Sequence, residues 1–98
     1  MTPDDVRRLA LGLEGAVEAP HHGFPSFRRR TIFATLPDEG TLNVLLVEER
    51  VRDAVAESPG FCAERWWGKK LTAVHVTLAD ADEQIVAELL ADAWEAHG

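Results

Sequence analysis

Apolar residues recur along the chain at two spacings, one typical of helices and one typical of strands. Near the N-terminus they lie three or four residues apart, which predicts a helix over residues 2–13. Thr2 suits the N-cap of this helix, and Gly15 can end it. The apolar face of the predicted helix consists of Val6, Leu9, Ala10 and Leu13.

Two further helices are predicted by the same spacing. A short helix over residues 48–58 ends at a Ser-Pro-Gly segment. The last helix has Asp80 as its predicted N-cap, with Glu83 completing a capping box, and it runs to about His97. Its broad apolar stripe, which includes Trp94, is typical of a helix packed on a core.

Alternation of apolar and polar residues predicts three strands. Residues 31–36 and 41–47 flank the turn sequence Pro-Asp-Glu-Gly, which predicts a β-hairpin. In the first of these strands, Phe33 is expected on the face opposite Ala34. Residues 71–78 alternate in the same way and predict a third strand.

The segments between these elements are rich in turn-forming residues. Residues 16–30 contain two prolines and a glycine, so we expect mostly loop, with a short strand over Phe24–Arg28. Residues 61–70 are expected to form a turn or a broken strand. The order of elements predicts a single α+β domain over residues 1–98, an antiparallel β-sheet with helices packed on one face.

Composition narrows the class of protein. The hydrophobic fraction of 46% and the charged fraction of 28% are ordinary for a globular protein. The net charge of −7 opposes non-specific attraction to nucleic acid or to anionic lipid. The single cysteine, Cys62, cannot form an internal disulfide, and the sequence has neither a secretory signal nor a long apolar run. We therefore expect a cytoplasmic protein that does not associate with membranes.

The charges are unevenly distributed along the chain. No Asp or Glu lies between Glu18 and Asp38, or between Glu64 and Asp80. These two acid-free windows hold six of the ten Lys and Arg residues: Arg28, Arg29, Arg30, Arg65, Lys69 and Lys70. Because the acids fall mainly on predicted helices, we expect an acidic helix side and a basic strand side. Either the arginines are a solvated turn, or this side contacts something negative.

Other residues that often carry chemistry have simple structural explanations. His21 and His22 are adjacent, so their side chains diverge and make a poor metal chelate. Cys62 is expected to be a buried small hydrophobe. At least one of Trp66 and Trp67 is expected in the core, although a Trp beside basic residues is also compatible with stacking on a base. No catalytic motif is present, which favours a protein that is not an enzyme and uses no cofactor.

An ordered series of short motifs spans nearly the whole chain. They are HGFPSFR (22–28), IFATL (32–36), Asn-Val (43–44), WGKK (67–70) and LLADAWE (89–95). In this order they resemble the MmcQ/YjbR family of small bacterial proteins. The resemblance implies a frataxin/CyaY-like fold with helices on one face of an antiparallel sheet. It also implies the label DNA-binding, proposed from a double-wing arrangement of strands and turns, and no agreed reaction or cofactor.

The resemblance and the charge distribution together predict where nucleic acid is bound. The predicted contact residues are Arg28, Arg29, Arg30, Arg65, Trp67, Lys69 and Lys70. Family members often carry a lysine after the Asn-Val pair, where this chain has Leu45, so no basic contact is expected there. The acidic first helix invites comparison with the iron-binding helix of frataxin, but Asp4 and Asp5 are more simply explained by the helix dipole.

The sequence therefore predicts weak, phosphate-dominated binding of double-stranded DNA. One alternative is a protein-interaction module whose basic face docks an acidic protein, or the acidic helix face of a second copy. Another is a protein that handles a small ligand or a metal through His21, His22 or Cys62.

Overall fold

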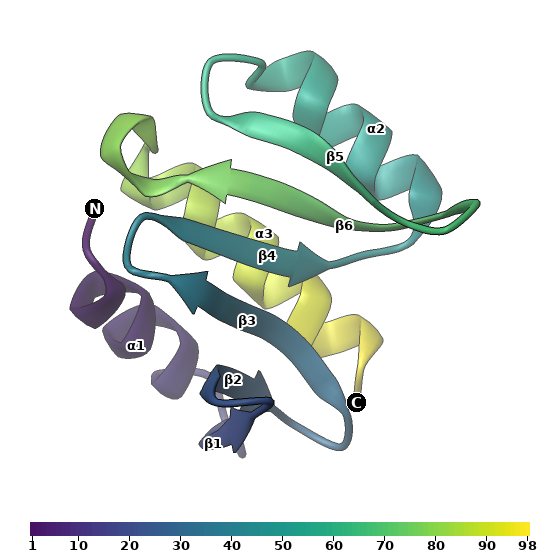
Figure 1. Cartoon of the computed structure of the whole chain (residues 1–98). Coiled ribbons are helices and arrows are strands. Elements are labelled where there is room, and N and C mark those ends of the chain that lie inside the picture. Colours follow the sequence, from purple (N-terminus) through teal and green to yellow (C-terminus); the bar gives the residue numbers. More distant parts are fainter.

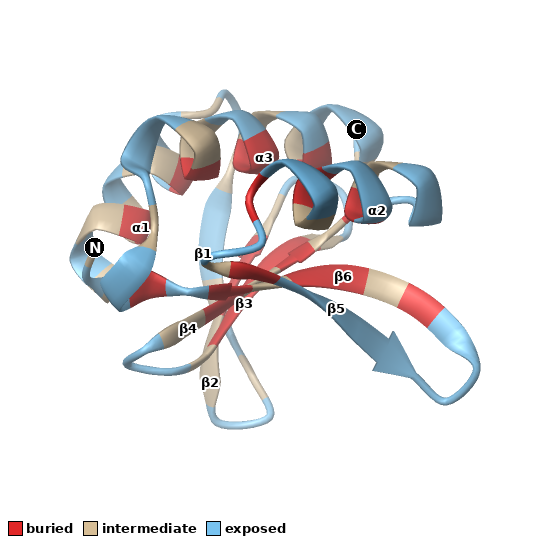
Figure 2. Cartoon of the chain, turned by 90° about the horizontal axis from the view of Figure 1, so that it is seen from above, coloured by how far each residue is buried: buried red, intermediate tan, exposed pale blue.

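The computed structural model describes all 98 residues and contains three helices and six strands. Their order is α1 (Pro3–Leu11), β1 (Val17–His21), β2 (Phe24–Arg28), β3 (Ile32–Asp38), β4 (Thr41–Leu45), α2 (Glu48–Glu57), β5 (Cys62–Trp67), β6 (Lys70–Thr77), a short 3₁₀ turn (Leu78–Asp80) and α3 (Glu83–Ala96). The strands form one antiparallel sheet in the order β1-β2-β3-β4-β6-β5. The three helices cover one face of the sheet and leave the other uncovered (Figure 1, Figure 2). The predicted α+β architecture is confirmed.

The core lies between the helices and the sheet face that they cover. Ala34 pairs with Val44 and Leu42 pairs with Val76, and all four side chains are fully buried. On the helix side, α3 contributes a fully buried apolar stripe to this core, made of Val86, Leu89, Leu90 and Ala93. Removal of this apolar surface from water is the main force that holds the two layers together.

Helix α1 begins as the sequence predicts. Thr2 is the N-cap, its hydroxyl accepts from the backbone N–H of Asp5, and the Asp5 carboxylate accepts from the Thr2 N–H at 2.8 Å. The bond from the Thr2 N–H holds the pKa of Asp5 below its ordinary value, because it favours the charged carboxylate. The helix ends earlier than predicted, with Gly12 as C-cap, while Gly15 takes a positive φ of 73° in the following turn.

Two segments contain more strand than expected: residues 16–30, where the predicted strand Phe24–Arg28 is confirmed as β2 but β1 was not predicted, and residues 61–70. Residues 17–28 form the β1–β2 hairpin, and its turn residues His22 and Gly23 both have positive φ, as a type I′ turn requires. Pro20 is tolerated because β1 is an edge strand. The second segment contains the complete strand β5, which a two-residue turn joins to β6, with positive φ at Gly68 as in a type II′ turn.

Two local predictions were wrong. The N-cap of α3 is Asp82, because the chain first forms the 3₁₀ turn that contains Asp80. Phe33 is fully buried in the core and not on the face opposite Ala34. A register shift between β2 and β3 inserts one extra β3 residue at this point, and such a bulge re-aims the neighbouring side chain.

Candidate nucleic-acid interface

The ten Lys and Arg residues fall into two groups according to their partners. Four arginines on α1 and α2 form ion pairs with carboxylates: Arg7, Arg8, Arg50 and Arg52. The other six, those of the two acid-free windows, form none. A cation that is already paired gives up its carboxylate when it binds an anion, whereas an unpaired cation gives up only water and counterions. The six unpaired cations therefore define the candidate interface.

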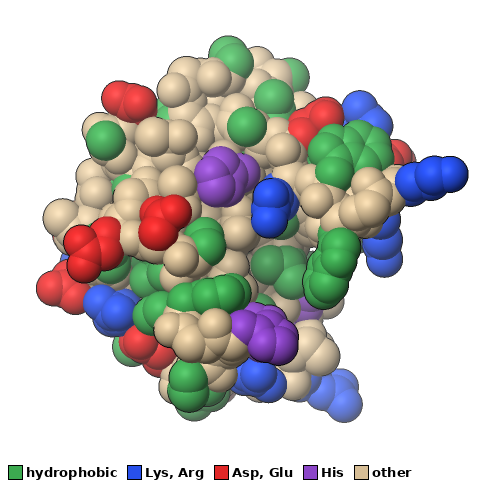
Figure 3. Space-filling view, viewed as in Figure 1, with side chains coloured by type: hydrophobic (Ala, Val, Ile, Leu, Met, Phe, Trp, Pro, Cys, Tyr) green, Lys and Arg blue, Asp and Glu red, His purple; other side chains and the backbone are tan.

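Both acid-free windows lie at the same end of the sheet. Arg28 pairs with Ile32 at the start of β3, beside the end of β4. Leu45, at that end of β4, pairs with Ala73, which pairs in turn with Arg65. Three strands nevertheless separate β2 from β5, which places them roughly 19 Å apart at about 4.8 Å per strand. Figure 3 accordingly shows Lys and Arg side chains gathered at the β5–β6 hairpin and again near β2 and β3, with a hollow between them.

Arg29 and Arg30 contact the end of α3. The Arg29 Nη1 donates to the Trp94 carbonyl at 3.1 Å, and its guanidinium carbon lies 3.9 Å from the centre of the Trp94 ring. Arg30 donates to the Gly98 carbonyl at 3.5 Å. Cations are favoured at a helix C-terminus by the helix dipole. These two predicted contact residues thus have a structural role in the free protein, and their guanidinium groups are only partly available to a ligand.

Substitution of Arg29 tests this structural role. Arg29→Ala is expected to lower the free energy of unfolding by about 1 kcal/mol, because it removes the cation–π contact with Trp94 and the charge at the end of α3. Lys69→Ala, at an exposed position without an ion pair, is expected to change it by less than about 0.5 kcal/mol. Urea unfolding of both variants measures the difference, and equal losses would contradict the role assigned to Arg29.

The β5–β6 hairpin carries the most accessible part of the candidate interface. Glu64 contacts Arg52 of α2 and accepts from the Trp66 indole N–H, which places Glu64 and Trp66 on the helix side of β5. Because side chains alternate, Arg65 and Trp67 project from the uncovered side. Trp66 is 43% exposed and Trp67 is 82% exposed, so the expectation that one of them lies in the core was wrong. Figure 2 shows the reason, since the hairpin bends away from the helices.

A row of polar side chains crosses the uncovered face. Ser26 pairs with Thr35, Thr35 with Asn43, and Asn43 with His75, so the four residues lie side by side on β2, β3, β4 and β6. The His75 Nδ1 and the Asn43 Oδ1 are hydrogen-bonded at 2.7 Å. Polar residues at alternating strand positions are the only sequence signal for this row. Their alignment depends on strand order and register, which the sequence pattern left open.

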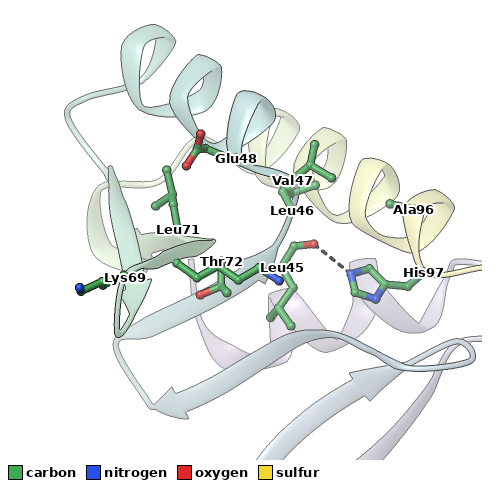
Figure 4. Close-up of a pocket in the computed structure, with 10 residues that line it drawn as sticks. Leu45, Leu46, Val47, Glu48, Lys69, Leu71, Thr72, Ala96 and His97 are labelled. Carbon is green, nitrogen blue, oxygen red and sulfur yellow. Dashed lines mark hydrogen bonds between the residues drawn. The ribbon is translucent and has the colours of Figure 1, made fainter.

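An open groove of about 700 Å³ lies between the β5–β6 hairpin and the end of α3. It is lined by Leu45–Glu48, Lys69–Thr72, Ala96 and His97. Figure 4 shows the His97 ring directed at the backbone of Leu45, where its Nε2 donates to the Leu45 carbonyl at 3.3 Å, while the Lys69 side chain points away from the groove. Its lining is half apolar, and it separates the two basic windows at this end of the sheet.

The histidines and the cysteine form no common site. The His21 and His22 rings are 4.3 Å apart in an edge-on contact, at the tip of the β1–β2 hairpin. Cys62 is buried as predicted, and burial raises the pKa of its thiol. Nowhere do three or more His, Cys, Asp or Glu side chains come together in a way that could hold a metal ion. None of the helices is long and apolar enough to span a membrane.

Comparison with known proteins agrees with the motifs. Neither curated proteins nor solved structures gave a match. The family model described as YjbR matches residues 11–96, a range that contains all six strands, α2 and α3. The chain therefore belongs to the MmcQ/YjbR family.

Proposed function

We propose that this protein is not an enzyme but binds double-stranded DNA weakly through its phosphates. The observation that carries the proposal is the division of the cations into two groups. Every helix arginine forms an ion pair with a carboxylate, whereas none of the six cations of the acid-free windows forms one. Each phosphate that such a cation neutralises releases condensed counterions, which favours binding at low salt.

The β5–β6 hairpin makes the first contact with DNA in this proposal. Its turn carries Lys69 and Lys70, and Arg65 lies two residues before the exposed ring of Trp67. A projecting hairpin can approach the phosphate backbone while the rest of the protein stays clear of the duplex. Arg28 adds a further contact from β2, and Arg29 and Arg30 contribute only where their bonds to the end of α3 allow.

The acidic residues limit and orient this interaction. The net charge of −7 repels DNA at long range. Because the acids lie mainly on the helices, the repulsion is strongest on the helix side and turns the uncovered face toward the ligand. Binding is therefore expected to be weak at physiological salt and clearly stronger at low salt.

An amide NMR titration with a random-sequence duplex tests the proposal. At low salt, shifts are expected for Arg65–Leu71 and for Arg28, and they should fade near physiological salt, because the contacts are with phosphates. Residues on the exposed side of α2 serve as the internal control and should not shift. Absence of shifts at low salt, or shifts without salt dependence, would overturn the proposed mechanism.

A second candidate function is docking of an acidic protein surface, in particular the helix face of another copy. The observation that favours it is the exposed apolar surface of Val47, Trp66 and Trp67 around the basic hairpin, since aromatic residues are enriched in protein interfaces. Under this alternative, light scattering shows a dimer that dissociates as salt is raised. A monomer at every salt concentration excludes self-association.

A further inference from the structure

We propose that the uncovered face of the sheet holds a single strand of DNA and binds it more tightly than a duplex. This inference rests on the proposed function, because the unpaired cations supply the attraction for phosphate in both cases. It specifies which class of nucleic acid is bound, and the side chains on the uncovered face determine that class.

The uncovered face is a trough between two hairpins. In Figure 2 the β1–β2 hairpin and the β5–β6 hairpin both extend from the side of the sheet that faces away from the helices. Between them lie β3, β4 and β6, which form the floor. Figure 3 looks onto this face and shows the hollow between the two hairpins.

The floor offers hydrogen-bonding atoms that have no partner within the protein. Asn43 and His75 bond to each other through the Asn43 Oδ1 and the His75 Nδ1. The Asn43 amide nitrogen and the His75 Nε2 remain free, and both residues are only partly buried. Donor and acceptor groups of this kind suit the edge of a base. In a duplex the Watson–Crick edges are engaged in base pairing, whereas a single strand can turn them toward the floor.

The walls of the trough carry rings that are exposed or partly exposed. Trp67, which is 82% exposed, projects from the β5 side. On the opposite wall, His21 pairs with Phe24, and their rings are 5.7 Å apart in an edge-on arrangement. Flat side chains on a groove serve as stacking surfaces for unpaired bases, and any base can stack on them.

Two guanidinium groups flank the floor. Arg65 lies on the β5 side and Arg28 on the β2 side, both toward the same end of the sheet. The Arg28 Nε is buried and has no hydrogen-bond partner. A buried donor without a hydrogen-bond partner costs free energy. Binding is therefore favoured if a phosphate draws the Arg28 side chain outward and accepts from its Nε and Nη together.

Charge repulsion also favours one strand over two. Asp38, the last residue of β3, and Glu39, in the β3–β4 turn, lie at the other end of the sheet. The Asp38 carboxylate accepts from the Gly40 backbone N–H at 2.8 Å, which holds the pKa of Asp38 below its ordinary value. A duplex carries twice as many phosphates as a single strand of the same length. The phosphates of the second strand are repelled by Asp38 and Glu39, and the protein has no further unpaired cations to neutralise them.

Fluorescence anisotropy with a labelled 12-nucleotide single strand of mixed sequence, and with the matching duplex, tests the inference. The single strand is expected to bind at least about tenfold more tightly, as stacking of one or two bases would give. The Asn43→Ala/His75→Ala variant should weaken single-strand binding by about tenfold and duplex binding by less than about twofold. Lys69→Ala/Lys70→Ala, the matched control, should weaken both.

The outcomes separate the inference from the proposed function. If the duplex binds as tightly as the single strand, or if the Asn43/His75 variant binds the single strand like the unchanged protein, the inference is wrong while phosphate binding stands. If neither probe binds at low salt, both are wrong. If the double variant fails to fold, Trp67→Ala, at an exposed position, provides the same comparison. It too should weaken binding of the single strand by about tenfold and binding of the duplex far less.

Discussion

Phe27→Ala is expected to remove about 3–5 kcal/mol from the free energy of unfolding, the largest loss of any single substitution considered for this protein. Phe27 is fully buried on β2, where it pairs with Ala34 on the sheet face that the helices cover. Truncation leaves a cavity where the ring meets the core, and the rigid sheet on one side limits how far neighbours can fill it. The free energy of unfolding of a small domain is only roughly 5–15 kcal/mol in total, so the variant is expected to be close to unfolding.

Phe24→Ala is the matched control, because it removes the same atoms from the same strand. Phe24 is only partly buried and packs edge-on against His21 near the hairpin tip, so we expect a loss on the order of 1 kcal/mol. Urea unfolding followed by far-UV circular dichroism measures both variants against the unchanged protein. Similar losses for Phe24 and Phe27 would contradict the division between a packed face and an uncovered face.

The sequence pattern predicted those elements that have one buried face. The apolar stripe of α3 and the alternation in 41–47 and 71–78 were both clear, because each of these elements packs on the core. Strands β1 and β5 were missed for the opposite reason. They are the two edge strands, and β5 is exposed at every residue except Cys62, so neither has an apolar face to produce a pattern.

The candidate site was predicted in its composition but not in its arrangement. Local charge identified the two acid-free windows, and charge can be counted along a sequence. That Arg29 contacts Trp94, near the other end of the chain, depends on tertiary packing, and so does the alignment of Asn43 with His75. The sequence did not show that both Trp66 and Trp67 are exposed, because large aromatic residues are usually buried in small domains, and only the outward bend of the hairpin prevents it here.

The division of the cations also reconciles the proposed binding of a polyanion with the negative net charge. The helix arginines neutralise nearby carboxylates, such as Arg8 with Glu83 at 2.7 Å and Arg50 with Asp92 at 2.9 Å. These pairs connect elements far apart in the sequence and consume positive charge on the helix side. Positive charge on the hairpin is left without carboxylate partners, because Arg65, Lys69 and Lys70 form no ion pair.

Removal of the hairpin cations is expected to have the largest effect on DNA binding. In the Arg65→Ala/Lys69→Ala/Lys70→Ala variant, the slope of log K against log salt concentration should fall by about 3, one for each lost phosphate contact. Affinity near 0.1 M salt should fall by roughly tenfold per contact, because each contact contributes about 0.9 to the exponent of the salt dependence. Anisotropy titrations of a labelled duplex at several salt concentrations measure both quantities.

The matched control changes the net charge equally but on the other side of the molecule. Ala56→Glu, Ala79→Glu and Gln84→Glu occupy exposed positions in α2, the 3₁₀ turn and α3, so the triple control should fold normally. It lowers the net charge as much as the hairpin variant does, yet it should leave the slope unchanged and weaken binding only slightly, through long-range repulsion. If the control weakens binding as much as the hairpin variant, the net charge governs DNA binding, and the assignment of the contacts to the β5–β6 hairpin is wrong.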